Sequence, residues 1–146
     1  MVDISFNVNS GPENNEIVHS YLREHAELRP LVLVLKYFLA QNRLNEPYWG
    51  GMGSYALVLL VTFIIKRRKA AAAPGTAMLD LGELLVEFFR FFGKELQTES
   101  EAVSVATPEV FTKESRGWFD PANPLSYSVE DPQNAGTVTL SFSRKN

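Results

Sequence analysis

Three short segments of this sequence carry side chains that could bind a phosphate or a divalent metal ion. Asp3 lies between apolar residues in a strand-like stretch, so its carboxylate could ligate a metal at a sheet edge or be an ordinary surface group. Lys36 interrupts an apolar stretch, where its ammonium could contact a phosphate or extend into solvent. The acidic segment Glu130–Gly136 is typical of a solvent-exposed turn.

A glycine-rich segment, Gly50–Gly53, comes directly before Ser54, Tyr55 and a strongly apolar stretch. Small residues at a helix start leave backbone N–H groups accessible, which favours an anion such as a triphosphate. Ser54 would add a hydroxyl donor, and Tyr55 a flat ring that can stack on a base. The same pattern also fits a plain loop before a buried helix. It is not a Walker loop, because the Gly-Lys-Ser/Thr ending is missing.

The composition predicts one globular domain and excludes several classes of site. Of the 146 residues, 45% are hydrophobic and 12% aromatic, enough for a sizeable core. The net charge of -3 argues against a free-standing nucleic-acid binder, although it leaves room for a local basic groove. The absence of cysteine excludes disulfides and zinc-thiolate sites. The apolar run from Tyr55 to Ile65 is too short to cross a bilayer, which needs about 20 residues, so no membrane partner is expected.

Apolar spacing predicts four helices, at residues 13–27, 30–43, 53–68 and 80–95. The second is apolar almost all round, so it should be the central helix. Asn9–Pro12 is typical of a turn before the first helix. Asp80 and Glu83 have the spacing of a capping box at the start of the fourth.

The basic run Lys66–Lys69 ends the third predicted helix. It could be a localisation patch, a phosphate contact or a solvated helix end. Short strands are predicted at 2–6, 103–105, 127–129 and 138–142, where apolar and polar residues alternate. The predicted fold class is therefore mainly α with short strands (α+β).

Taken in order, these segments resemble the noncanonical (Trf-type) poly(A) polymerases, which belong to the DNA-polymerase-β-like nucleotidyltransferases. The match covers most of residues 2 to 132, and it depends on several blocks in the same order: Val2–Asn7, Leu31–Leu39, Leu44–Glu46, Gly50–Leu57, Gly82–Phe89 and Val129–Pro132. The resemblance implies a C-terminal fragment with the central helical domain of such an enzyme. Residues 1–10 would be a remnant of the catalytic palm strand. Residues 11–146 would form the helical nucleotide-binding domain with a C-terminal nucleotide-recognition segment.

The resemblance implies addition of AMP from ATP to RNA 3′ ends, with two Mg²⁺ (or Mn²⁺) ions held by three strand carboxylates. Asp3 matches the third of these carboxylates, which makes it the expected catalytic and metal-binding residue. Asn7 lies near the family's ribose contact. RNA 3′ ends and a nucleoside triphosphate are therefore the expected substrates.

Five further residues match positions that hold the nucleotide in the family. Lys36 matches the lysine that holds the terminal phosphates, and Ser54 matches a second triphosphate ligand. Tyr55 matches the ring that stacks on the base. Glu130 and Asp131 open the segment that matches the nucleotide-recognition loop.

Two features depart from the family pattern. The family's Gly-Ser motif and paired Asp-x-Asp precede the third carboxylate, and no later segment of this sequence replaces them. One carboxylate cannot hold two metal ions, so the chain alone is expected to be inactive. The recognition loop usually continues with an Asn-Asp pair and an arginine, whereas Gly136–Thr139 follows here and leaves base selectivity open.

Two alternatives remain. A terminal uridylyltransferase would share the Gly-Ser-Tyr segment that holds the nucleotide. Uridylyltransferases are expected to carry a second lysine one turn after Lys36, and this sequence lacks it. The chain could instead be a non-catalytic docking module, because the family resembles members of assemblies with a zinc-knuckle RNA-binding protein and a helicase. The expected location is the nucleus, with the cytoplasm and the mitochondrion as alternatives.

Overall fold

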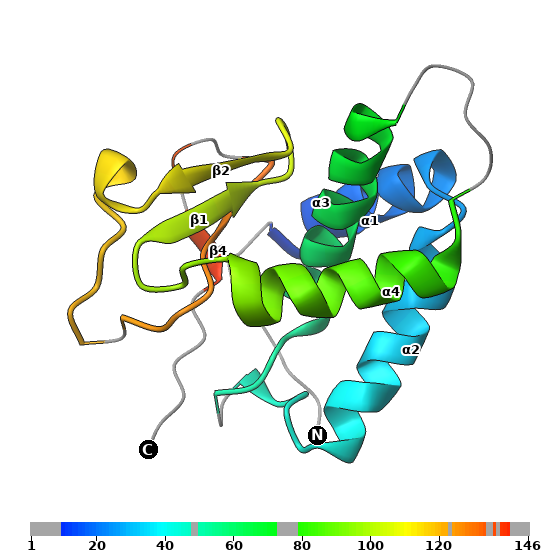
Figure 1. Ribbon diagram of the computed structural model, residues 1–146, viewed down its shortest axis with the longest axis horizontal. Coiled ribbons are helices and arrows are strands. Elements are labelled where there is room, and N and C mark those ends of the chain that lie inside the picture. Colours follow the sequence, from blue (N-terminus) through cyan, green and yellow to red (C-terminus); the bar gives the residue numbers. More distant parts are fainter. Residues whose placement is uncertain are drawn as a thin grey trace.

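The computed structural model places a body of four α-helices beside a small four-stranded sheet within the residues it describes (Figure 1). It describes residues 10–47, 50–72, 79–122, 124–133, 136 and 138–140. The helices are α1 (Ser10–Glu24), α2 (Leu28–Gln41), α3 (Ser54–Ala71) and α4 (Leu81–Arg90). The predicted class, mainly α with short strands, is confirmed. No helix in these ranges has the length and apolar character needed to span a bilayer.

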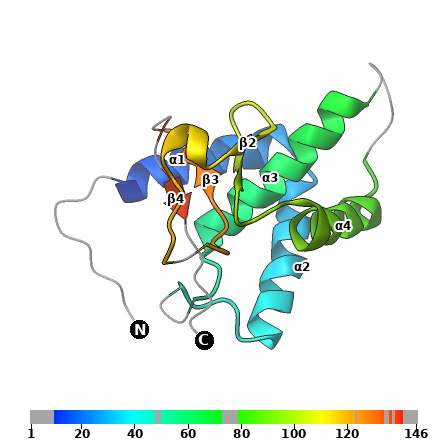
Figure 2. The same ribbon diagram turned by 60° about the vertical axis from the view of Figure 1, so that its left-hand side comes forward.

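The central helix is α3 and not α2 (Figures 1 and 2). Every residue from Ala56 to Ile65 is buried, and α3 contacts α1, α2, α4 and the sheet. Helix α2 buries one stripe and leaves Leu33 and Val34 60% and 52% exposed. The prediction that the second helix is central was therefore wrong. An apolar stretch in the sequence shows how much of a helix surface could be buried. The number of elements that pack against the helix decides how much of that surface is buried in the fold.

The helix starts follow the local sequence signals with one exception. Helix α1 begins at Ser10, so the turn predicted at Asn9–Pro12 was wrong for Ser10–Pro12; proline is compatible with a first helical turn. At the start of α4, the Asp80 carboxylate accepts the Glu83 N–H at 2.9 Å, which confirms the predicted cap.

The fourth helix reaches Glu95 as predicted, but its last turn changes its hydrogen bonding. After α4 the chain forms a π-helical turn, η2 (Phe91–Glu95), in which the Leu96 N–H donates to the Phe91 carbonyl at 2.9 Å. This turn places the rings of Phe91 and Phe92 against Phe63 of α3, at 5.3 and 6.1 Å between ring centroids. The aromatic cluster thereby joins α4 and η2 to the central helix.

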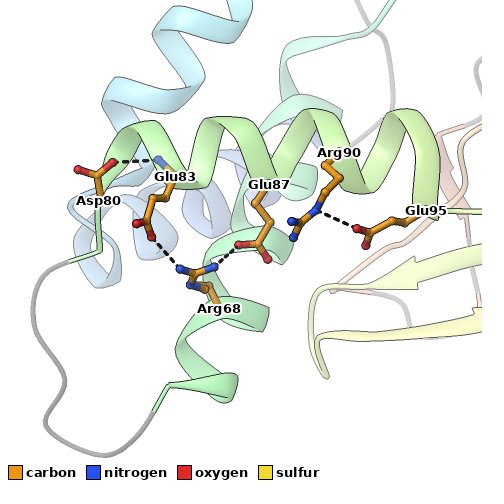
Figure 3. Close-up of polar contacts among 6 residues, drawn as sticks. All are labelled: Arg68, Asp80, Glu83, Glu87, Arg90 and Glu95. Atoms are coloured by element: carbon orange, nitrogen blue, oxygen red, sulfur yellow. Dashed lines mark hydrogen bonds and ion pairs between the residues drawn. The ribbon is translucent and has the colours of Figure 1, made fainter.

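Ion pairs on the solvent side join the same two helices (Figure 3). Arg68 of α3 reaches between Glu83 and Glu87 of α4, with N–O distances of 2.7 and 3.0 Å. A further pair does not involve α3: Arg90 of α4 pairs with Glu95 of η2 at 2.9 Å. Exposed pairs of this kind contribute little individually, so the buried aromatic cluster accounts for most of the α3–α4 packing energy.

The sheet has the order β2-β1-β3-β4. Its strands are β1 (Glu101–Ser104), β2 (Glu109–Thr112), β3 (Val129–Glu130) and β4 (Val138–Leu140), and the 3-10 turn η3 (Glu114–Arg116) follows β2. Strand β1 pairs antiparallel with β2 and parallel with β3, and β4 pairs antiparallel with β3. Strand β2 was not predicted, because it is a largely exposed edge that backbone pairing defines. The strand predicted at 2–6 lies outside the described residues.

Two polar side chains fix the segment before β3, one to η2 and one to the segment that follows η2. The Tyr127 hydroxyl, just before β3, donates to the Phe92 carbonyl of η2 at 2.7 Å. The Lys113 side chain is 2% exposed, and its ammonium donates to the carbonyls of Thr98 and Ser126. Burial lowers the pKa of Lys113. These bonds hold the segment before β3 in one position relative to the helical body.

The central position of α3 predicts unequal costs for two leucine truncations. Leu59→Ala, at a residue with 0% exposure, should lower the free energy of unfolding by about 2–5 kcal/mol because it leaves a cavity. The matched change Leu33→Ala on α2, at 60% exposure, should change it by less than about 0.5 kcal/mol. Urea unfolding of both variants measures the difference, and equal losses would contradict the placement of α3 as the core helix.

Candidate functional site

The segment between α2 and α3 is a tight loop that requires glycine. Gly51 donates its N–H to the Glu46 carbonyl at 2.9 Å, and the next residue, Met52, donates to the Leu44 carbonyl at 2.6 Å. A Cβ on Gly51 would lie 2.6 Å from the Leu44 carbonyl oxygen. The neighbouring Gly50 has a φ of 81°, which favours glycine. These glycines therefore allow close backbone approach, and the loop delivers Ser54 to the first position of α3.

Lys36 and Ser54 line the same cleft, which has a volume of about 300 Å³. Lys36 comes from α2 and Ser54 from the start of α3, and both residues are exposed. The first backbone N–H groups of α3 lie at this end of the helix and carry the positive end of its dipole. Lys36 makes no hydrogen bond or ion pair with another described residue. A cation, a hydroxyl and a helix N-terminus thus gather where a phosphate could bind, and Glu46 is the acidic residue in the same lining.

A larger cleft of about 420 Å³ adjoins the first, and Leu39 and Met52 line both. Its described lining is mostly apolar and includes Leu125 and Tyr127 but no charged residue. It therefore offers no ionic partner to a phosphate, and the smaller cleft is the better candidate for an anion.

Tyr55 turns away from this cleft, because successive residues of a helix point about 100° apart. Its ring is half-buried against the core, and its hydroxyl is fully buried without a hydrogen-bond partner among the described residues. Burial, followed by the charge of Asp131 and by Tyr21, raises the pKa of Tyr55 to about 12. The structure thus brings Tyr55 close to the acidic segment, with part of the ring still accessible.

The acidic segment, defined here as Glu130–Gln133 with Gly136, is a turn as predicted, with Gln133 and Gly136 exposed, but its first residue is buried. Glu130 is 7% exposed, and its Oε1 accepts the Gly136 N–H at 3.3 Å. The Asp131 carboxylate accepts the Gln133 N–H at 3.0 Å. The Gln133 side chain donates to Asn14 of α1 at 3.1 Å, so the segment is tied to the first helix. It lies inward because the sheet pairing of β3 buries its first residue.

Two predicted site residues, Asp3 and Asn7, lie outside the described residues. Within the described ranges, no three His, Cys, Asp or Glu side chains gather in a way that could hold a metal ion. The described part of the chain therefore does not fit a metal centre by itself. The roles predicted for Asp3, Asn7, Lys36, Ser54, Tyr55, Glu130 and Asp131 stay predictions.

Sequence reasoning missed two residues that contact the acidic segment. Arg116 of η3 pairs with Glu130 at 3.5 Å, and the Trp118 indole N–H donates to the Gly136 carbonyl at 3.2 Å. Neither residue lies in a recognisable motif. Only the fold brings this part of the chain next to β3, so neither contact has a local signal in the sequence.

Each residue of the basic run Lys66–Lys69 makes a contact within the chain. None of the three interpretations from the sequence, a localisation patch, a phosphate contact or a solvated helix end, therefore describes the run fully. Lys66 donates to the Val105 carbonyl at 3.1 Å, and the Arg67 guanidinium lies over the Phe91 ring at 4.4 Å. Arg68 pairs with α4 (Figure 3), and Lys69 pairs with Glu27 at 3.2 Å. The run joins the C-terminal end of α3 to its neighbours.

The close approach at Gly51 predicts a cost for adding a single methyl group. Gly51→Ala should destabilise the fold by about 1–3 kcal/mol, because the new Cβ meets rigid backbone atoms of Leu44 and Glu46. Gly93→Ala is the matched control, since a Cβ there meets nothing within 4 Å. Thermal and urea unfolding compare the two variants. A Gly51→Ala chain as stable as the wild type would contradict this account of the loop.

The lowered pKa of His25 predicts that the free energy of unfolding of this chain falls in acid. Burial, and then the charge of Lys69, lower the pKa of His25 below 6.5; Lys66 also lowers it, and Glu24 and Glu27 raise it. Below pH 6.5 the unfolded chain therefore binds a proton that the folded chain does not, so stability present above that pH is lost as the pH falls.

This pH dependence is measured by urea unfolding at about pH 7.5 and about pH 5.5. The difference between the two free energies should shrink in His25→Gln and stay unchanged in His19→Gln, which alters an exposed histidine of α1. An equal difference in the wild type and in His25→Gln would show that His25 is not the group responsible.

Comparison with known proteins agrees with the resemblance seen in the sequence. Residues 80–136 match the family described as Cid1 family poly A polymerase. The poly(A) RNA polymerase CID14 of Cryptococcus neoformans is 37% identical over 135 residues, which cover 91% of this chain and 18% of that protein. The terminal uridylyltransferase cid1 of Schizosaccharomyces pombe is 26% identical over 147 residues, covering 80% of this chain and 36% of that protein.

The solved polymerase core of TRAMP, an RNA surveillance complex, has a similar structure. It aligns with a TM-score of 0.71 and 30% identity over 92% of this chain and 43% of that chain. This chain spans about a fifth of the length of the poly(A) polymerases that it matches. Its helical body and small sheet correspond to the helical domain of that polymerase fold. The relatives are named poly(A) RNA polymerases and a terminal uridylyltransferase, which are nucleotidyltransferases. Residues 80–136 of this chain therefore match the Cid1 family poly A polymerase model, and most of the chain is similar to part of the poly(A) RNA polymerases.

Proposed function

We propose that this chain is the nucleotide-gripping helical domain of an RNA 3′-terminal nucleotidyltransferase that adds AMP from ATP. The observation that carries this proposal is the convergence of Lys36 and Ser54 on one cleft at the N-terminal end of α3. An ammonium group, a hydroxyl group and the helix N-terminus all favour a highly charged anion such as a triphosphate. The similarity to poly(A) polymerases over most of the chain supports the same function.

In the proposed reaction, the 3′-hydroxyl oxygen of RNA attacks the α-phosphorus of ATP. A phosphodiester bond forms and the bond to pyrophosphate breaks. Lys36 and Ser54 hold the terminal phosphates and stabilise the charge that develops on the leaving pyrophosphate. Tyr55 stacks on the base, and Asp131 beside it offers a carboxylate to hydrogen-bond donors on the edge of the base.

Metal chemistry in this proposal depends on residues that the structure does not describe. Two Mg²⁺ or Mn²⁺ ions would activate the 3′-hydroxyl and neutralise phosphate charge when bound. Asp3 is the one metal ligand predicted in this sequence, and it lies outside the described residues. We therefore expect no nucleotide transfer by this chain alone.

We propose ATP as the substrate in preference to UTP. Ala40 lies one turn after Lys36 on α2 and lines the same cleft, at the position where a second lysine is expected in uridylyltransferases. The greater identity to a poly(A) polymerase than to the uridylyltransferase, 37% against 26%, supports the same choice. The uridylyltransferase function is the alternative, and nucleotide selectivity decides between the two.

A docking function is a second candidate because α2 and α4 share an exposed apolar face. Tyr37 and Phe38 of α2 are 68% and 44% exposed, and Phe38 contacts the ring of Phe89 on α4 at 5.1 Å. Exposed apolar faces of this kind often mark interaction surfaces. The zinc-knuckle protein and the helicase stay predicted partners, and the nucleus stays the predicted location.

The proposal predicts selective losses of nucleotide binding in variants of this chain. Lys36→Ala should weaken ATP binding at least tenfold and leave AMP binding almost unchanged, because only ATP carries the terminal phosphates. Tyr55→Ala should weaken both, since base stacking is worth about 1–3 kcal/mol. Arg29→Ala, an exposed change on α2 outside the cleft, is the control. Calorimetric titration with ATP, UTP and AMP measures each affinity.

Incorporation from each of the four triphosphates is then measured with a longer polypeptide that places paired carboxylates before this sequence. AMP addition that Asp3→Ala abolishes is the expected result. Preferred use of UTP would favour the uridylyltransferase alternative. Loss of ATP and AMP binding in equal measure in Lys36→Ala would argue against a phosphate role for this lysine.

A further inference from the structure

The acidic segment is held in place by a part of the chain that contributes little to the core. The excursion formed by β2, η3 and Trp118 is largely exposed, and its edge strand buries no complete side chain. Such an excursion adds little stability through apolar burial. Apart from the bonds of Lys113 to Thr98 and Ser126, two polar contacts from this excursion reach the two ends of the acidic segment.

The first contact fixes the start of the segment. The Arg116 guanidinium pairs with Oε1 of Glu130 at 3.5 Å, and the Glu130 side chain is only 9% exposed. The same carboxylate oxygen accepts the Gly136 N–H, so one group links Arg116 to both ends of the segment. The Arg116 guanidinium also lies over the Phe111 ring of β2, at 5.4 Å from its centroid, which restricts where the arginine can point.

The second contact fixes the end of the segment. The Trp118 indole N–H donates to the Gly136 carbonyl at 3.2 Å. The indole ring packs edge-on against the same Phe111 ring, with 5.3 Å between centroids. Gly117, which joins the two residues, has a φ of 69°, and this left-handed turn directs Arg116 and Trp118 to the same side. Phe111 therefore serves as a common platform for both polar contacts.

We propose that Arg116 and Trp118 are positioning residues that hold the acidic segment beside α3, which contacts β3, and thereby determine which base the site accepts. Glu130 precedes Asp131 directly, so fixing the Glu130 carboxylate fixes the backbone that carries the Asp131 carboxylate. Discrimination between bases depends on polar groups held at defined positions, because a misplaced group rejects the wrong base poorly. This inference rests on the proposed nucleotide function, since selectivity has meaning only if a base binds beside Tyr55.

The test uses three substitutions in this chain. Trp118→Phe keeps an aromatic ring on Phe111 but removes the indole donor, and Arg116→Ala removes the partner of Glu130. Arg90→Ala is the matched control, because it breaks a comparable exposed Arg–Glu pair at 2.9 Å far from the acidic segment in the sequence. Arg116→Lys tests whether charge alone suffices without the planar group over Phe111.

Two measurements are made on each variant. Hydrogen exchange of the Gly136 amide should speed up at least fivefold in Arg116→Ala and in Trp118→Phe, while Arg90→Ala stays at the wild-type rate. The ratio of ATP to UTP affinity should fall at least threefold in the same two variants, without an equal loss for both nucleotides. Arg116→Lys should recover part of this ratio.

Unchanged exchange of the Gly136 amide in Arg116→Ala and Trp118→Phe would overturn the positioning role. Equal weakening of ATP and UTP would overturn the selectivity role, because it would reveal a general structural defect. If the wild-type chain binds no nucleotide, the proposed function fails, and the hydrogen exchange result alone still accepts or rejects the positioning role.

Discussion

The complete burial of α3 from Ala56 to Ile65 is the constraint on which the rest of this structure depends. A helix that is buried on all sides has no polar face to turn toward water, so other elements must surround it. The buried hydroxyl of Thr62 donates to the Val58 carbonyl of the same helix at 2.8 Å and needs no outside partner. Helices α1, α2 and α4 and the strand β3 then pack around α3 because it is the largest apolar surface available to them.

Because its sides are buried, α3 meets polar groups mainly at its two ends, and the ends differ in what they do. At the C-terminal end, the cations of Lys66–Lys69 are engaged by carbonyls, carboxylates and aromatic rings of the chain itself. At the N-terminal end, Ser54 stays exposed beside Lys36, in a cleft that the glycine loop shapes. One end of the helix thus stabilises the body, and the other presents groups to a ligand.

The sheet matters to the candidate site mainly through the segment that it positions. Tyr127 attaches the region before β3 to η2 by a hydrogen bond to the Phe92 carbonyl. Lys113 links the Ser126 carbonyl of that region to the Thr98 carbonyl, in the segment between η2 and β1. Pairing of β3 with β1 and β4 then buries Glu130 and brings Asp131 near Tyr55. The Asp131 carboxylate, which directly follows β3, thereby helps to raise the pKa of Tyr55 on α3, although 76 positions separate Tyr55 and Asp131 in the numbering of the chain.

The sequence by itself determined the four helices, the Asp80 cap and the resemblance to poly(A) polymerases, because local spacing and ordered motifs encode these features. Its strand predictions at 103–105 and 138–142 overlap β1 and β4 but differ from them in their bounds. It also identified Lys36 and Ser54 as candidates, since a lone lysine and a glycine-led helix start stand out from their neighbours. Only the tertiary structure decided that α3 and not α2 is central, that β2 pairs at the edge, and that Arg116 and Trp118 reach the acidic segment. Those features depend on contacts between distant parts of the chain. A short window of residues carries no information about which partner it will meet.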